Sequence, residues 1–148
     1  MASKVEEELR KLSVEIRILE ETAGALQSRI NMVSAVITDL TYANMTLEGL
    51  EKHKKDVELF VPIGGSSYIK AELHDSDKVI VGMGAGVSVE KTFPEAKEIV
   101  KRRLEELEKT RMSLQQRFSQ VAQRINEDRA GFEELAAEFR KGKSSRNV

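Results

Sequence analysis

The hydrophobic pattern of this chain changes at residues 57–70, which read VELFVPIGGSSYIK. Apolar and polar side chains alternate there with a period of two, which predicts two β-strands, at residues 57–61 and 67–73. The intervening Gly64-Gly65-Ser66 has the composition of a tight turn. The stretch therefore predicts a β-hairpin.

A second hairpin is predicted directly after the first. Residues 78–81 and 87–89 alternate in the same way, and a glycine-rich run at 82–86 separates them. Isolated two-stranded hairpins are marginally stable in water and leave unpaired edges. We therefore expect region 57–90 to assemble with other subunits through its apolar strand residues, which are Val57, Leu59, Val61, Tyr68, Ile69, Val79, Val81, Val87 and Val89.

The segment before the hairpins carries a heptad repeat. Apolar residues recur in steps of four and three from Val5 to Leu47, and Asn44 is the one polar residue in this stripe. A spacing that averages 3.5 residues keeps one face of a helix against a partner helix. The pattern predicts a coiled-coil helix over residues 4–55.

The segment after the hairpins predicts a second helix, over residues 92–140. Thr92 and Glu95 have the spacing of a capping box, in which the threonine hydroxyl accepts a hydrogen bond from the first turn. The apolar stripe then runs from Val100 to Phe139. Residues 141–148 are mostly small, polar and basic, so we expect a disordered tail there.

The two helical segments have matching lengths and can fold back on each other. Two charged residues, Arg111 and Asp128, interrupt the second stripe, and we expect Asp128 to loosen the last third of the coil. One register accommodates both stripes, and it pairs Leu9 with Phe139, Ile30 with Phe118 and Leu47 with Val100. The predicted fold is mainly α: a single domain over residues 1–148, with a long antiparallel two-helix coiled coil and two β-hairpins (four short strands) inserted between the helices.

The composition favours long helices over a compact globule. Charged residues make up 33% of the chain and aromatic residues 5%, and there is no Trp. The net charge of −1 offers no overall attraction to nucleic acid or to an anionic membrane, and neither partner is expected. The absence of Cys, of a signal peptide and of a long apolar run favours a cytoplasmic protein.

An enzyme is not expected. The run VIVGMGAG at residues 79–86 suggests a dinucleotide-binding loop, but its third Gly comes one residue early and a strand pattern follows where a helix is needed. His53 and His74 are the only histidines, and neither has a ligand partner at a suitable spacing. We therefore predict no catalytic residues, no metal site and no cofactor.

Two heptad segments flanking a pair of hairpins resemble the prefoldin family over essentially the whole chain. Residues 61–70, VPIGGSSYIK, are similar to the first-hairpin motif of the α class, and residues 79–90 resemble its second-hairpin region. The resemblance implies a hetero-hexamer of two α-type and four β-type subunits (α2β4), assembled through the hairpins. It also implies an ATP-independent chaperone, or holdase, that takes non-native client proteins at the coiled-coil tips and passes them to a group II chaperonin.

Mapped onto this chain, the implied binding site for unfolded proteins lies in the first and last turns of the coil. Its apolar residues are Val5, Leu9, Leu12, Phe132, Leu135 and Phe139. The same residues also fit an ordinary coiled-coil core, and both interpretations hold at once if the ends of the coil open. The main alternative function is a structural coiled-coil scaffold or tether that binds no client.

Overall fold

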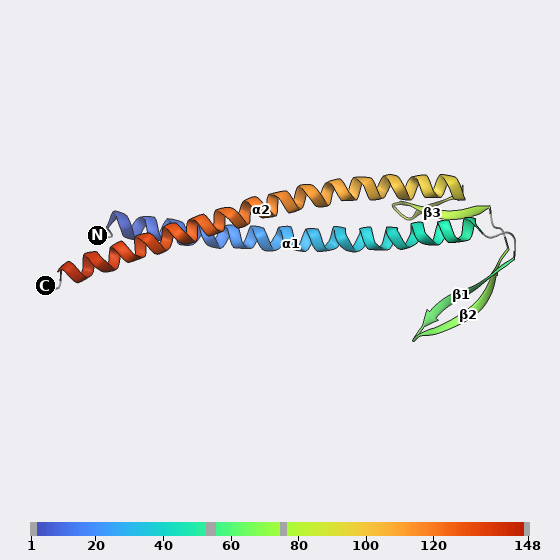
Figure 1. Ribbon diagram of the computed structural model, residues 1–148, viewed down its shortest axis with the longest axis horizontal. Coiled ribbons are helices and arrows are strands. Elements are labelled where there is room, and N and C mark those ends of the chain that lie inside the picture. The colour runs from blue at the N-terminus through green and yellow to red at the C-terminus, as the bar shows by residue number, and fades with distance from the viewer. Residues whose placement is uncertain (1–2, 53–55, 75–76, 147–148) are drawn as a thin grey trace. The chain divides into compact units, whose positions relative to one another are not determined.

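The computed structural model describes residues 3–52, 56–74 and 77–146, and its architecture confirms the predicted fold class. Two long helices, α1 (Lys4–Glu51) and α2 (Phe93–Arg146), run side by side in opposite directions (Figure 1). Two hairpins lie between them in the sequence. His53 and the last two residues of the predicted tail, 147–148, lie outside the described residues.

Side-chain hydroxyls cap the start of both helices. The backbone N–H of Glu6 donates to Ser3 Oγ at 3.3 Å, and that of Glu95 donates to Thr92 Oγ1, also at 3.3 Å. The first N–H groups of a helix have no partner within the helix, so each hydroxyl satisfies one of them. The predicted role of Thr92 as N-cap is confirmed.

The helices end at different residues from those predicted. The first was expected to reach residue 55, but α1 ends at Glu51 and Lys52 already lies in a turn. The backbone of Asp56 has a φ of 67°, which no helix accommodates, so the chain leaves helical geometry before β1 begins.

The disordered tail expected at residues 141–148 is a second difference, because α2 continues through this segment to Arg146. Lys143 and Arg146 lie in the last turn, where positive charge interacts favourably with the helix dipole. The Lys143 ammonium also lies 4.9 Å from the centre of the Phe139 ring, a cation–π contact one turn back along the helix.

Each hairpin is a two-stranded antiparallel sheet. Strand β1 (Val57–Gly64) pairs with β2 (Ser67–Leu73), and β3 (Lys78–Gly84) pairs with β4 (Val87–Thr92). Three of the strands are longer than predicted, because the backbone pairing continues into the glycines and polar residues at their ends.

The two hairpin turns use the same backbone geometry. Gly65 and Ser66 have φ values of 53° and 59° in the first turn, and Ala85 and Gly86 have 52° and 76° in the second. Two successive residues with positive φ make the turn whose twist matches that of the flanking strands. Glycine adopts this conformation without steric cost, which explains the glycine-rich composition of both turns.

The chain divides into two compact units, and each has its own core. The terminal unit comprises residues 3–34 and 109–146 of the described chain. Its centre is a buried cluster of Leu26, Ile30 and Leu114, against which Val33, Phe118 and Val121 pack. Ile30 and Phe118 thus lie in one cluster, as the predicted register requires.

The hairpin unit comprises residues 35–108 and has a larger core at the start of α2. Its buried members are Leu47, Val81, Phe93, Ala96 and Val100, and side chains of both hairpins, Leu73 and Val79, pack against them. Leu47 and Val100 are together here, which confirms a second layer of the predicted register. The pairing of Leu9 with Phe139 stays a prediction.

Candidate functional surfaces

The six residues predicted to bind unfolded proteins all lie on the seam between the helices of the terminal unit. Each of them is half-buried: Val5, Leu9 and Leu12 on α1, and Phe132, Leu135 and Phe139 on α2. A two-stranded seam covers its apolar residues from two sides only. The structure therefore keeps these side chains packed while leaving part of each accessible to solvent.

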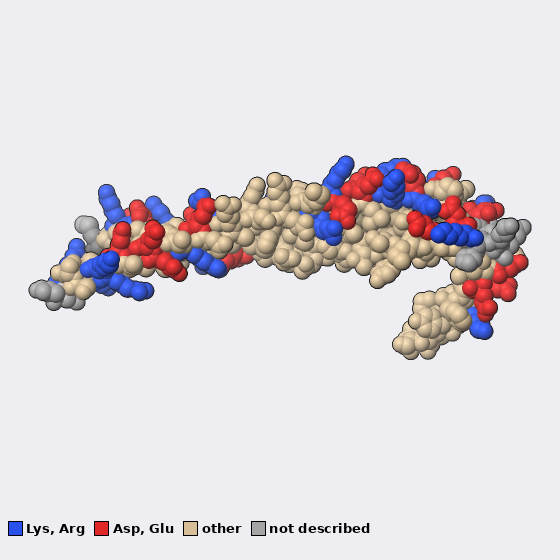
Figure 2. All heavy atoms as spheres, viewed as in Figure 1, with Lys and Arg blue, Asp and Glu red and all other residues tan. Residues whose placement is uncertain are grey.

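The first turn of α1 and the last turns of α2 line a pocket of about 280 Å³. Val5 and Phe139 supply its apolar surface, and Glu6, Glu138 and Lys143 are among its charged residues. Figure 2 shows side chains of both charge signs interspersed with uncharged ones over the terminal turns. The pocket therefore combines an apolar patch with a rim of acidic and basic side chains, and neither sign of charge predominates.

A second apolar surface of the terminal unit was missed by the heptad reasoning. Val14 and Ile18 are 48% and 53% exposed, and with Leu19 they line an open groove of about 430 Å³ on α1. Neither Val14 nor Ile18 belongs to the seam, because both lie outside the steps of four and three. Their own i, i+4 spacing places them on one face of the helix, and this was the signal available in the sequence.

Asp128 is the one buried charged residue among the described part of the chain, with 6% of its surface exposed. Its Oδ1 lies 3.3 Å from Arg124 Nε, and its Oδ2 has no hydrogen-bond partner among the described residues. Burial raises the pKa of this carboxyl above the ordinary aspartate value, and the negative charge of Glu15 raises it further. The neighbouring Arg124 guanidinium opposes both effects on the pKa.

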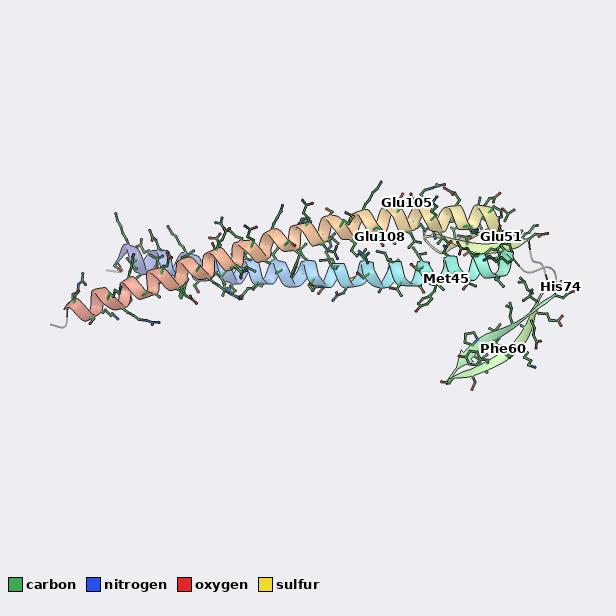
Figure 3. The ribbon with its side chains drawn as sticks, in the orientation of Figure 1. Met45, Glu51, Phe60, His74, Glu105 and Glu108 are labelled. Atoms are coloured by element: carbon green, nitrogen blue, oxygen red, sulfur yellow. The ribbon has the colours of Figure 1, made fainter. Side chains whose placement is uncertain are left out.

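The first hairpin exposes most of its apolar residues. Val57 and Leu59 are half-buried, whereas Val61, Tyr68 and Ile69 of the predicted assembly surface are exposed. Towards the turn this hairpin carries uncharged side chains, as Figure 2 shows, and Phe60 projects from the strand in Figure 3. Sequence reasoning missed Phe60, which is 64% exposed, because alternation assigned the opposite face of the strand to assembly. It missed Ile63, which is 59% exposed, because the predicted strand ended at residue 61.

The second hairpin uses one of its faces inside the chain. Val81 is buried in the core of the hairpin unit and Val79 packs against that core, so these two predicted assembly residues contact the chain's own helices. Val87 and Val89, at 55% and 37% exposed, remain available to a partner. Ile80 points to the other face and is 75% exposed, which makes it an assembly candidate that the sequence reasoning did not include.

The glycine-rich run at residues 82–86 ends β3, turns and enters β4. No helix follows it directly, so it lacks the helix N-terminus with which a dinucleotide loop holds its phosphates. His74 is exposed and follows β2 (Figure 3). Within residues 3–52, 56–74 and 77–146, no group of three or more His, Asp or Glu side chains could hold a metal ion.

The helices also lack the character of membrane spans. Over the described residues, neither α1 nor α2 contains a stretch that is both long and apolar enough to cross a bilayer.

Comparison with known proteins gives one consistent result. The family model described as "Prefoldin subunit" matches residues 19–138. Prefoldin subunit alpha of Methanococcoides burtonii is 36% identical over 125 residues, which are 84% of this chain and 91% of the relative. Prefoldin subunit alpha of Methanobrevibacter smithii is 34% identical over 132 residues, which are 89% and 90% of the two chains.

A solved structure shares the fold. The cryo-EM structure of filamentous PFD from Methanocaldococcus jannaschii matches with a TM-score of 0.66 and 24% sequence identity, over 85% of this chain and 98% of that one. This likeness shows a shared fold.

Proposed function

Because this chain belongs to the prefoldin family, a family of chaperone subunits, we propose that it is an α-type subunit of an ATP-independent holdase. In this proposal the terminal turns of the coiled coil bind non-native client proteins, and the complex passes them to a group II chaperonin. The observation that carries the proposal is the accessible apolar surface of the terminal unit. It combines the half-buried seam with the exposed Val14 and Ile18.

The terminal surface suits clients of many sequences. It is apolar, shallow and flanked by charges of both signs, including Arg10, Lys11 and Glu15 at the groove. Such a surface selects exposed apolar segments, which are what folding intermediates present and what drives their aggregation. It requires no particular sequence in the client.

Affinity comes from several weak contacts acting together. One coiled coil offers a small apolar area, so a single contact is weak and reversible. Several subunits that hold the same client gain avidity from their fixed geometry, and release needs no nucleotide hydrolysis. This mechanism makes assembly through the hairpins essential to activity.

For assembly we propose that the exposed apolar residues of the hairpins join β-type subunits in an α2β4 hexamer. Phe60, Tyr68, Ile69, Ile80 and Val87 are each more than half exposed in the single chain. Apolar surface of this kind on a two-stranded sheet favours association, because an isolated hairpin has little of its own to bury. A cytoplasmic location remains part of the proposal.

The decisive experiment is suppression of aggregation without ATP. A chemically unfolded client is diluted into buffer containing this chain with a β-type partner, and light scattering is recorded. We expect full-length protein to suppress scattering and a truncation to residues 21–127, which removes both the terminal seam residues and the groove, to lose that effect while the oligomer persists. Protection of no client by an intact oligomer would leave the structural scaffold as the function.

Point variants separate the two terminal surfaces. Val14→Ser combined with Ile18→Ser removes the two exposed apolar side chains of the groove and leaves Leu19 and the seam unchanged, and we expect it to reduce protection by severalfold. Met112→Ser, at a residue of α2 that is 67% exposed, is the matched control and should protect like the parent chain. Equal protection by the double variant and the control would restrict client binding to the seam.

A further inference from the structure

Three charged side chains connect the helices of the terminal unit in an arrangement that a coiled-coil seam does not require. Arg124 of α2 donates from Nη2 and Nε to Glu15 Oε1 of α1, at 3.0 and 3.2 Å. The same Nε lies 3.3 Å from Asp128 Oδ1. The Arg124 guanidinium therefore contacts two carboxylates, and one of them, that of Asp128, occupies a buried position in the seam.

The two carboxylates have different surroundings. The Glu15 and Arg124 side chains are 41% and 56% exposed, so solvent screens their pair and reduces its contribution. The Asp128 side chain is 8% exposed, and its second oxygen has no hydrogen-bond partner within the described residues. A buried carboxylate with an unsatisfied oxygen is costly, whereas the protonated carboxyl loses both the charge and the repulsion from Glu15.

We propose that Asp128 is a proton-controlled latch of the terminal unit, with the helices packed more stably when the carboxyl is protonated than when it is ionised. The groups that face it are Glu15 from α1 and Arg124 and Glu127 from α2 itself. Burial and the two glutamates favour the neutral form, and Arg124 favours the charged form. When the carboxyl is ionised, the buried charge loosens the seam, which makes the apolar residues of the terminal turns more accessible.

The sign of the pH dependence follows from linkage. The folded chain holds the Asp128 proton more tightly than the unfolded chain, because burial raises the pKa of this carboxyl in the fold. The stabilisation is fully present below the ordinary aspartate pKa. It is lost as pH rises from there through the raised pKa, and above that pH no further change comes from this group.

The direct test is a carbon NMR titration of the Asp128 carboxyl in the full chain. We expect a midpoint above the ordinary aspartate pKa, and a midpoint at or below that value overturns the proposal. Two variants should move the midpoint in opposite directions: Glu15→Gln should lower it by removing a negative charge, and Arg124→Gln should raise it by removing the positive one. Shifts of the same sign in both variants, which a merely structural role predicts, also overturn it.

A second measurement follows the unfolding midpoint of the full chain in urea as a function of pH. Asp128→Asn, a neutral residue of the same shape, should unfold at a higher urea concentration than the parent at every pH above the titration midpoint of Asp128. It should also lose the parent's pH dependence around that midpoint. Glu133→Gln, at an exposed position of α2, should keep the parent's pH profile. An Asp128→Asn chain that is less stable than the parent above that midpoint would contradict the latch. Since neither readout involves a client, the result is independent of whether the proposed chaperone function holds.

Discussion

Arg103 of α2 donates a hydrogen bond of 2.6 Å from Nη2 to the carbonyl oxygen of Gly82 in β3. The two residues are 21 positions apart in the sequence. The guanidinium thereby ties the second hairpin to the first turns of α2, beside the core formed by Val81, Ala96 and Val100. The hairpin is held by a side chain at its glycine-rich end and by apolar packing along one face.

Loss of this contact should loosen the second hairpin without unfolding the helices. Arg103→Met keeps the aliphatic part of the side chain and removes the donor, and we expect a cost of about 0.5–1.5 kcal/mol for this one hydrogen bond. Hydrogen exchange of the β3–β4 amides should become faster. Arg102→Met, at the exposed neighbouring position, should leave these exchange rates unchanged.

The cap of α2 can be tested by a pair of substitutions. Thr92→Ala removes the hydroxyl that accepts from the Glu95 N–H and should destabilise the hairpin unit by about 0.5–2 kcal/mol. Thr92→Ser keeps the acceptor and should restore most of this loss. Chemical denaturation followed by circular dichroism gives both values, and equal stability of the Ala and Ser variants would contradict the capping role.

The seam of the terminal unit should be sensitive to truncation of its most buried leucines. Leu114 is 4% exposed, and Leu114→Ala should cost about 2–5 kcal/mol, because it removes apolar burial and leaves a cavity. Met112→Ala, two residues away and 67% exposed, should change the free energy of unfolding by less than about 0.5 kcal/mol. Similar losses at both positions would contradict the assigned face of α2.

Two glycines should respond to alanine in opposite directions. At the helical Gly131 an added Cβ would meet only Leu12 Cδ1, at an ordinary contact distance of 3.9 Å, so Gly131→Ala should stabilise the chain by about 0.5–1 kcal/mol. Gly65 has a φ of 53° in the first hairpin turn, and Gly65→Ala should cost about 1–2 kcal/mol. Thermal unfolding compared with the parent chain measures both effects.

Association through the hairpins should weaken when a charged side chain replaces one of their exposed apolar residues. We expect Phe60→Lys and Ile80→Lys each to weaken association with β-type subunits at least about tenfold, which corresponds to about 1.4 kcal/mol. Size-exclusion chromatography with light scattering reads the oligomer, and circular dichroism checks that the helices persist. Light scattering of the parent sample also distinguishes a closed hexamer from a filament, which is the form named for the structurally similar PFD.

Much of the architecture could be predicted from local patterns. The heptad stripe identified both helices and a register that places Leu47 with Val100 and Ile30 with Phe118 in common clusters. The glycines at positions 64, 65, 84 and 86 marked both hairpin turns, since successive positive φ angles favour this residue. The ends of the elements were less accurate because helix ends depend on contacts and charges that periodicity does not include.

The functional surfaces depended more on tertiary structure. Strand alternation gave Val79 and Val81 the same role as Val87 and Val89, but the first pair packs on α2 and the second is exposed. Val14 and Ile18 could be identified as part of an apolar surface only from the groove that they line in the folded chain. Val81 and Val89 pair directly across the hairpin and lie on the same face, so alternation identifies that face but cannot tell which part of it the chain's own helices cover.

The sequence by itself determined the periods of its apolar residues, and those periods specified two long helices, two hairpins and their order, since each period is a local property of the backbone. Tertiary structure alone decided which apolar faces are covered, and that Glu15 of α1 shares Arg124 with a buried Asp128. Burial, and the pairing of Glu15 with Arg124 across 109 positions of sequence, are not local properties. They become defined only when the antiparallel helices bring those residues together.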